Sequence, residues 1–294
     1  MRYTRVHLEA IGYELAPVVV SSEELEERLA PLYDRLHLEE GALEALTGIA
    51  ERRWWEPDEP LSRGASSAAT KALAASNVRA QDVGALLYVG VCRESFEPAT
   101  ACRVAANIGV GGPAAVYDLS NACLGVLNGI QEVANRIELG QIRAGLVVSA
   151  ETAREIVDVT IDRMLEEGTV EFWTEALATL TGGSGAIAVL LTDGSFDGGP
   201  GHRVLGGAQR AAPQHHGLCR WGLADAPTLH RPEPLPQAMF TDSVAVLQHG
   251  VQLGVETWRD FLAEMEWQPE DVDRLICHQV GAPHRDTILK SIGM

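Results

Sequence analysis

Short apolar segments that alternate with helical segments constrain the fold of this chain more than any other feature. Residues 85–91 (ALLYVGV) form a continuous apolar run, which is typical of a parallel strand buried on both faces. Further segments with strand character lie at 5–12, 114–120, 144–151 and 185–192. Segments with helical character lie at 22–36, 64–76, 97–109 and 123–141. This order predicts an α/β fold with a mainly parallel sheet covered by helices.

Local signals refine the helical segments. Ser21 precedes the first helix and Glu24 follows three residues later, which is the pattern of a capping box. Pro31 lies inside the same helical pattern and is expected to kink or split it. Residues 155–180 add an amphipathic helical segment before the last strand of the series. This segment either lines a substrate cavity or a subunit interface, or simply covers the core.

A stretch rich in Gly, Asp and Pro at 193–202 divides the chain into two halves. The predicted domains are an N-terminal half, 1–200, with the helical insertion at 155–180, and a C-terminal half, 201–294. The second half starts at RVLGGA (203–208) and continues with a long helix at about 242–265, an apolar strand at 274–280 and a helix at 283–293. It stops at Met294, before further strands close a sheet, so we expect this half to be truncated.

Charge and cysteine content exclude several classes of protein. The 294 residues contain 41 acids and 23 bases, and the formal charge of −18 argues against a nucleic-acid binder. Five cysteines without a CxxC pair predict free thiols in a reducing compartment. Neither a signal peptide nor an apolar run of about 18 residues is present, so we expect a cytoplasmic protein without a membrane span.

Cys123 is the strongest candidate for a catalytic residue. It lies in SNACLGV, directly after a predicted strand and at the start of a predicted helix. Backbone N–H groups and the helix dipole at such a position favour the thiolate and can lower a cysteine pKa from its ordinary value. A strand-to-helix turn also presents a nucleophile at the carboxyl edge of an α/β sheet. The alternative is a small buried core residue.

Two further residues are candidates for acid–base chemistry. His278, in ICHQV, ends a predicted strand in the second half, where it either enters a cleft opposite Cys123 or is a core histidine bonded to the backbone. Glu97 lies in the loop VCRESFEPATA and is either a base in a partly buried pocket or an acidic residue at a helix N-terminus. Glu94 is a nearby competitor for the role of base.

The other motifs do not indicate a metal site, a phosphate-binding loop or a further catalytic residue. HHGLC, with His215, His216 and Cys219, lacks the full ligand set of a zinc site, so no metal is expected. TGGSG at 181–185 matches neither a P-loop nor GxGxxG and is interpreted as a tight turn. Cys92, Cys102, Cys219 and Cys277 are interpreted as packing residues.

Four segments in order resemble the thiolase-fold ketoacyl-acyl-carrier-protein synthase III family. They are GIAERRWWEPDE, DLSNACLGVLNG, TGGSGAIAVLL and ICHQVGAPH, and the resemblance covers essentially the whole chain. Within that family the chain is most similar to the OleA-type long-chain acyl-CoA condensing enzymes of olefin biosynthesis. Glu97, Pro98, Ala99, Thr100 and Ala101 resemble their Glu-Pro-Ser/Thr-Ala pattern, as do LCR at 218–220 and the insertion at 155–180.

The resemblance implies a five-layer αβαβα fold built from two pseudo-repeated halves, and a homodimer. It implies a Claisen condensation in which Cys123 is acylated by a fatty acyl thioester and a second acyl-CoA then loses an α-proton. Glu97 of the partner subunit is the expected base and His278 the expected oxyanion donor. Coenzyme A or acyl-carrier-protein thioesters are the expected substrates, and no cofactor is expected.

The family pattern also leaves alternatives. Family members continue with a Gly-Asn segment and closing elements that these 294 residues lack, and Ala42 and Leu43 occupy the region of an adenine-stacking Trp. A decarboxylating synthase III would use Cys123 and His278 in the same places. Glu97 would then be only structural, because loss of CO₂ from a malonyl thioester supplies the carbanion. A catalytically inactive partner subunit is the third interpretation.

Overall fold

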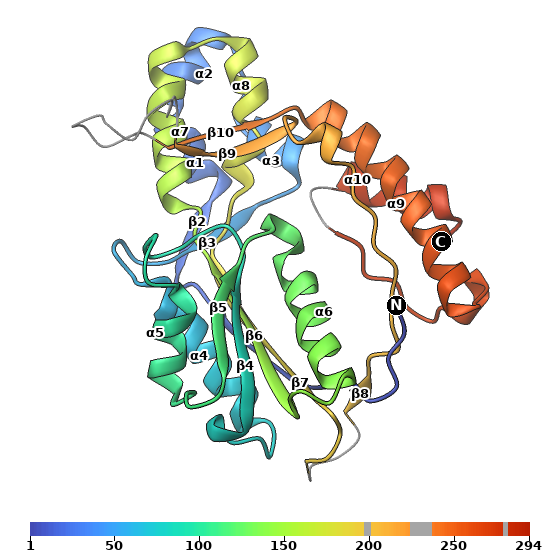
Figure 1. The fold of residues 1–294 in the computed structure, drawn as a ribbon. Coiled ribbons are helices and arrows are strands. Elements are labelled where there is room, and N and C mark those ends of the chain that lie inside the picture. The colour runs from blue at the N-terminus through green and yellow to red at the C-terminus, as the bar shows by residue number, and fades with distance from the viewer. Residues whose placement is uncertain (197–200, 224–236, 279–281) are drawn as a thin grey trace.

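A six-stranded sheet forms the centre of the protein, in a computed structural model that describes residues 1–196, 201–223, 237–278 and 282–294 (Figure 1). The strands follow the order β5-β4-β6-β7-β1-β8. Their bounds are β1 (His7–Leu15), β4 (Val83–Val89), β5 (Ala115–Leu119), β6 (Ala144–Glu151), β7 (Gly185–Thr192) and β8 (His202–Arg203). The remaining strands form two pairs, β2 (Val18–Ser21) with β3 (Glu51–Trp54) and β9 (Cys219–Leu223) with β10 (Gln237–Thr241).

The central sheet is mixed. Strand β4 runs parallel to β5 and β6, whereas β7 is antiparallel to both β6 and β1. The expectation of a mainly parallel sheet is therefore wrong. Continuous apolar sequence reports burial on both faces of a strand, and β7 has that burial while running in the opposite direction.

Helices cover both faces of this sheet (Figure 1). On one face lie α4 (Leu61–Ala74) and α5 (Thr100–Ile108), and on the other lies α6 (Gly125–Glu138). The small residues of α4 allow a close approach to the sheet, because a methyl group on Gly12 of β1 would lie 2.0 Å from the Ala68 carbonyl oxygen. The helices predicted at 64–76, 97–109 and 123–141 are thus confirmed, with shifts of a few residues at their ends.

A helical lobe with its own apolar core lies beyond one end of the sheet (Figure 1). It consists of α1 (Ser22–Arg28), α2 (Ala30–Leu36), α3 (Ala42–Thr47), α7 (Arg154–Glu167) and α8 (Val170–Ala176). The predicted helix 22–36 divides at Leu29, just before Pro31, and the predicted capping box is present: Glu24 N donates to Ser21 Oγ at 3.0 Å. The predicted segment 155–180 forms α7 and α8, which pack against the N-terminal helices.

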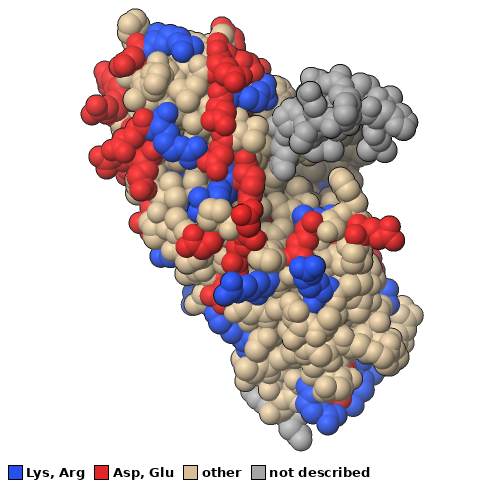
Figure 2. Space-filling model, turned by 90° about the vertical axis from the view of Figure 1, so that its left-hand side faces the viewer, with Lys and Arg blue, Asp and Glu red and all other residues tan. Residues whose placement is uncertain are grey.

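The lobe carries much of the acidic charge. In Figure 2 red Asp and Glu side chains gather over the upper part of the visible face, with fewer blue Lys and Arg side chains between them. Helix α7 alone has the sequence REIVDVTIDRMLEE, with five acids and two arginines. This face of the lobe therefore has a negative electrostatic potential, which disfavours the approach of anions.

The C-terminal part is dominated by α9 (Ser243–Met265) and α10 (Ala282–Ile292), which pack on one another. Both helices were predicted. The predicted strand at 274–280 is wrong for its described part, because residues 274–278 form no strand and Ile276 is 90% exposed. A strand needs a neighbouring strand for its hydrogen bonds, and no described segment provides one here. The strands formed by the described residues of 201–294 are β8, which joins the central sheet, and the β9–β10 pair.

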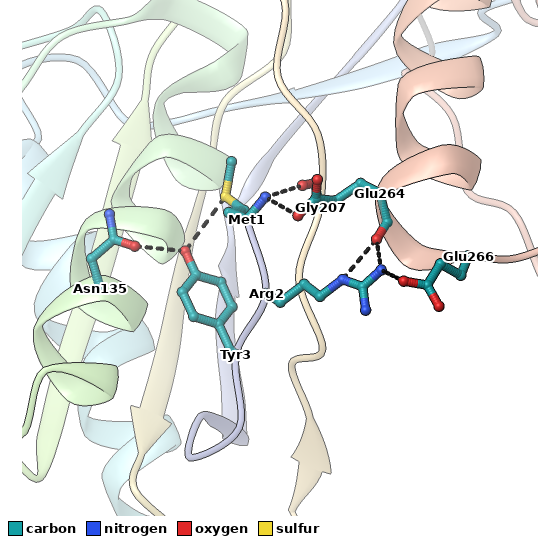
Figure 3. A network of polar contacts seen from close by, with 7 residues as sticks. All are labelled: Met1, Arg2, Tyr3, Asn135, Gly207, Glu264 and Glu266. Carbon is teal, nitrogen blue, oxygen red and sulfur yellow. Dashed lines mark hydrogen bonds and ion pairs between the residues drawn. The ribbon is translucent and has the colours of Figure 1, made fainter.

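Polar contacts from the N-terminus hold the end of α9 (Figure 3). The Met1 ammonium group lies 2.7 Å from a carboxylate oxygen of Glu264. Arg2 Nε donates to the Glu264 carbonyl oxygen at 2.7 Å, and Arg2 Nη2 pairs with Glu266 at 2.8 Å. Arg210 forms another ion pair with α9, to Glu256 at 2.7 Å, nearer the amino end of the helix than Glu264.

Among the helices of the described residues, none combines the length and the apolar character that a membrane span requires.

Candidate active site

Three neighbouring strands end at one edge of the sheet, and each of them brings a cysteine or a glutamate to that edge. Because β5, β4 and β6 are parallel, their carboxyl ends lie at the same edge. The turn with Cys123 follows β5, the loop with Glu97 follows β4, and β6 ends at Glu151. This edge is therefore the candidate active site.

Cys123 lies in a 3₁₀ turn, Ala122–Leu124, between β5 and α6, as the sequence predicts. Ala122 has φ +43°, a left-handed conformation that non-glycine residues rarely adopt. Such strained turns are common where a nucleophile is presented between a strand and a helix. The Cys123 residue is exposed, so a thioester can approach it.

The electrostatics of Cys123 differ from the sequence-based expectation. Desolvation by the protein atoms around the sulfur raises the pKa of the Cys123 thiol, and the neighbouring Cys219 and Glu151 raise it further. A backbone hydrogen bond within Cys123 itself lowers the pKa but does not compensate. The expectation that the helix start would lower this pKa is therefore wrong. Helix α6 begins only at Gly125, after the turn that carries the thiol.

Glu97 and Glu94 behave differently in the loop after β4. The Glu94 carboxylate accepts a hydrogen bond from Ser62 N at 2.7 Å and lies 3.4 Å from Arg103, so it is engaged in structure at the start of α4. Glu97 is exposed and has no hydrogen-bond or ion-pair partner in the described parts of the chain. Its neighbour Phe96 is 98% exposed. The loop therefore exposes an apolar ring and a carboxylate to solvent.

His278 is exposed and lies in an irregular segment between α9 and α10. Gln279 and Val280, which complete the ICHQV motif, lie outside the described residues. No contact joins His278 to Cys123 in the described chain. The structure thus brings Cys123 and Glu151 together and leaves Glu97 and His278 on separate exposed segments.

A metal centre finds no support in the described residues, which contain no group of three or more His, Cys, Asp and Glu residues able to hold an ion. His215 of the HHGLC motif instead stacks on His249 of α9, with ring centroids 3.9 Å apart. Cys219 begins β9 and its sulfur lies 3.6 Å from the Thr241 hydroxyl oxygen.

Glu151 is the functional candidate that the sequence reasoning missed. Its carboxylate accepts hydrogen bonds from Val91 N at 2.8 Å and Cys92 N at 3.1 Å. The one signal in the sequence is an acidic residue at the end of the apolar run AGLVVSAE.

Comparisons with known proteins identify the fold and the class of enzyme. The model of the protein family described as "3-Oxoacyl-[acyl-carrier-protein (ACP)] synthase III" matches residues 117–210. An acyl-CoA:acyl-CoA alkyltransferase of Shewanella oneidensis is 54% identical over all of this chain and 84% of its own length. A Xanthomonas campestris protein of the same name is 33% identical over all of this chain and 83% of its own. The crystal structure of cerulenin-bound Xanthomonas OleA superposes with a TM-score of 0.90, covering all of this chain and 82% of that one, at 33% identity.

Solved structures of the Xanthomonas protein include variants at one cysteine, one glutamate and one histidine. There the glutamate precedes the cysteine by 26 residues, the same separation as between Glu97 and Cys123. The histidine follows the cysteine by 142 residues there, whereas His278 follows Cys123 by 155. One of these structures contains lauric acid and lauroyl-CoA.

The fold and the cysteine turn define a thiolase-fold acyltransferase related to ketoacyl synthase III. More narrowly, the chain belongs to the family of OleA-type acyl-CoA:acyl-CoA alkyltransferases.

Proposed function

We propose that this enzyme joins two fatty acyl-CoA molecules by a non-decarboxylating Claisen condensation, through an acyl-Cys123 intermediate, to give a 2-alkyl-3-oxoacyl product. The observation that carries the proposal is the placement of Cys123 in a strained, exposed turn at the sheet edge, 26 residues after Glu97, which has no partner among the described residues. The names of the two alkyltransferase relatives and the lauroyl-CoA in one OleA structure support acyl-CoA as the substrate.

The first half-reaction is acyl transfer. The Cys123 sulfur attacks the carbonyl carbon of an acyl-CoA, the carbon–sulfur bond to CoA breaks, and CoA leaves as a thiol once it takes up a proton. Because the pKa of Cys123 is raised, the thiol is mostly protonated before attack and its proton has to leave as the bond forms. The chemistry needs acyl thioesters alone, and we assign no cofactor to it.

The second half-reaction makes a carbon–carbon bond. A base removes the α-proton of a second acyl-CoA, and the resulting carbanion attacks the acyl-Cys123 carbonyl carbon and displaces the sulfur. We assign the base to Glu97 of the partner subunit, since this carboxylate projects from its own subunit without a partner in the described chain. We assign His278 as the donor to the developing oxyanion. The α-proton of a thioester is weakly acidic, so both groups have to be close to it.

The assignment of Glu97 requires a dimer. Strand β5 is an edge of the central sheet, and its outer side is unpaired in the described structure. Open edges pair readily with other strands. Phe96, fully exposed beside Glu97, provides an apolar anchor for a second copy. We propose a homodimer that covers the β5 edge and carries each Glu97 to the other subunit's Cys123, with the protein in the cytoplasm and the chain organised as halves 1–200 and 201–294.

The test is incubation of the purified protein with a long-chain acyl-CoA and no malonyl thioester. CoA release is followed in solution, and extracted products are identified by mass spectrometry. A 2-alkyl-3-oxo acid or its decarboxylated ketone is expected. Acylated Cys123 without a condensed product, together with turnover after malonyl thioester is added, would replace the proposal with a decarboxylating synthase. Absence of acylation would indicate an inactive partner subunit.

A further inference from the structure

The Glu151 carboxylate links two neighbouring strand ends. Glu151 is the last residue of β6, whereas its two hydrogen-bond donors, Val91 N at 2.8 Å and Cys92 N at 3.1 Å, belong to the segment that follows β4. Its own carbonyl oxygen accepts a hydrogen bond from the Trp55 indole at 3.0 Å. One side chain thus fixes the start of the loop that leads to Glu97.

The same carboxylate lies against Gly90, which in turn contacts the start of α6 beside the cysteine turn. Gly90 has φ +131°, and a methyl group there would lie 1.9 Å from a Glu151 carboxylate oxygen. On its other side Gly90 meets α6, because a methyl group on Gly125 would lie 2.9 Å from the Gly90 nitrogen. Gly125 is two residues from Cys123. Glu151, Gly90 and the first residue of α6 therefore form one continuous set of contacts beneath the candidate nucleophile.

The far end of the loop is fixed in a similar way. The Asp118 carboxylate, on β5, accepts hydrogen bonds from Thr100 N and Ala101 N, both at 2.9 Å. Acidic side chains on β6 and β5 thus hold the two ends of the segment 93–99. Its tip, with Phe96 and Glu97, is exposed between two fixed ends.

We infer that Glu151 is a positioning residue for the condensation step, because its carboxylate fixes the backbone from which the Glu97 loop extends. The inference rests on the proposed function and adds a residue to it. Glu151 itself need not touch substrate, and it acts through the placement of Glu97.

The chemistry of the carboxylate explains why a neutral amide is a poor replacement. Both oxygens of Glu151 accept from backbone N–H groups, whereas the amide of Gln has one accepting oxygen and an NH₂ group that donates. Glu151→Gln therefore leaves one N–H of the loop facing another donor. A displacement of about 1 Å in a catalytic group can cost about a hundredfold in rate. Acyl transfer to Cys123 does not require Glu97, so it should be far less affected than condensation.

The charge of Glu151 provides a second, independent readout. Glu151 and the Cys219 thiol both raise the pKa of Cys123, in addition to burial. Removing the charge in Glu151→Gln should shift the pH profile of Cys123 alkylation toward lower pH. Glu151→Asp keeps the charge but has a shorter reach, so its profile should remain near that of the wild type while condensation still falls.

The experiment compares wild type, Glu151→Gln, Glu151→Asp and a matched control, Glu138→Gln. Glu138 also accepts from two consecutive backbone N–H groups, Thr4 at 2.9 Å and Arg5 at 3.0 Å, far from the candidate site. Each full-length protein is given lauroyl-CoA. The burst of CoA release reports acyl transfer, product formation reports condensation, and peptide mass spectrometry after iodoacetamide treatment reports Cys123 alkylation across pH. Melting temperatures identify damage to the fold.

We expect Glu151→Gln to retain the burst and to lose about tenfold to a hundredfold in condensation, with Glu138→Gln unchanged. Condensation at the wild-type rate in Glu151→Gln would overturn the inference. So would equal losses of acyl transfer and condensation in both Glu151 variants, or an unchanged alkylation profile in Glu151→Gln. Failure of the wild type to condense lauroyl-CoA would instead refute the proposed function, so the two failures are distinguishable.

Discussion

Gly125 and Gly90 approach so closely that a methyl group on Gly125 would lie 2.9 Å from the Gly90 nitrogen. This contact seats the start of α6 on the end of β4 and thereby fixes the distance of the Cys123 turn from the sheet. A side chain cannot enter the contact unless backbone moves, since the two nearest atoms belong to the main chain of Gly90.

Gly125→Ala is therefore expected to displace the Cys123 turn. Overpacking of this kind typically destabilises a protein by about 1–3 kcal/mol. The rate of acyl transfer to Cys123 should fall, as measured by the burst of CoA release, and urea unfolding should report the loss of stability. Gly111→Ala is the matched control, because a methyl group on Gly111 meets no atom within 4 Å. Equal burst rates in the two variants would show that the contact does not position Cys123.

Glu97→Ala separates the two half-reactions. If Glu97 removes the α-proton, the variant should still form acyl-Cys123 and release one equivalent of CoA, but it should form no condensed product. General bases typically contribute about a hundredfold to ten-thousandfold in rate. Mass spectrometry of intact protein and of extracted lipid checks both parts. Persistent condensation in Glu97→Ala would remove Glu97 from the role of base, and Glu94→Gln would then be the next variant to assay.

Phe96→Ala tests the proposed dimer contact. A fully buried aromatic anchor at an interface contributes about 2 kcal/mol or more, which corresponds to about a 30-fold weaker association. Sedimentation velocity over a range of protein concentrations measures this change. Leu139→Ala is the control. Leu139 is 72% exposed at the carboxyl end of α6, whereas the Cys123 turn precedes the amino end of that helix. A monomeric wild type, or equal effects of the two substitutions, would refute the dimer contact.

Cys92 should make the protein less stable in alkaline solution. Burial and the neighbouring Glu151 raise the pKa of this thiol in the folded state, whereas in the unfolded chain it ionises near its ordinary value of about 8.5. Above that pH the unfolded state releases a proton that the folded state keeps, so the free energy of unfolding falls by up to about 1.4 kcal/mol per pH unit. Thermal melts between pH 7.5 and 10 should show a smaller decline in Cys92→Ala than in Cys102→Ala. Parallel declines would contradict this origin.

Ion pairs, rather than a buried apolar surface, hold α9 against the body of the protein. Helix α9 has no fully buried residue in the described structure, and Arg210 forms ion pairs with Glu256 and Asp260, both of which are half-buried on α9. Arg210→Gln should accelerate amide hydrogen exchange in α9, and added salt should move the wild type in the same direction because it screens exposed charges. Arg63→Gln breaks an ion pair with Glu59 elsewhere and serves as the control. Salt-independent exchange in α9 would refute the electrostatic attachment.

Local patterns in the sequence were sufficient where a segment's structure depends on its own residues. The apolar runs at 144–151 and 185–192 coincide with β6 and β7, and Ser21 forms the expected capping box. The strand-to-helix turn at Cys123 was also predictable, because the change of periodicity marks it. The family resemblance, which depends on four short motifs in order, was likewise confirmed.

Properties that depend on distant segments were not predictable in the same way. The direction of β7 depends on the path of the chain through the helical lobe. Residues 274–278 have the composition of a strand, but a strand also needs a neighbouring strand to pair with, and the described structure places none beside them. The raised pKa of Cys123 depends first on desolvation by the surrounding protein and then on Cys219 and Glu151, which are remote in sequence. The role of Glu151 is not visible in the sequence, because its hydrogen-bond donor Val91 lies 60 residues away.

The separate apolar core of the helical lobe has a consequence for how this enzyme can change. The lobe residues that cluster around Trp54 and Met164 are distinct from those beneath the sheet edge, so substitutions in the two regions should have nearly additive effects on stability. Substitutions in the lobe core should therefore lower the stability of the lobe without adding to the effects of substitutions under the sheet. Two separate cores divide the substitutions that alter packing in the lobe from those that alter packing under the sheet, which makes the lobe core a natural target for a directed-evolution library.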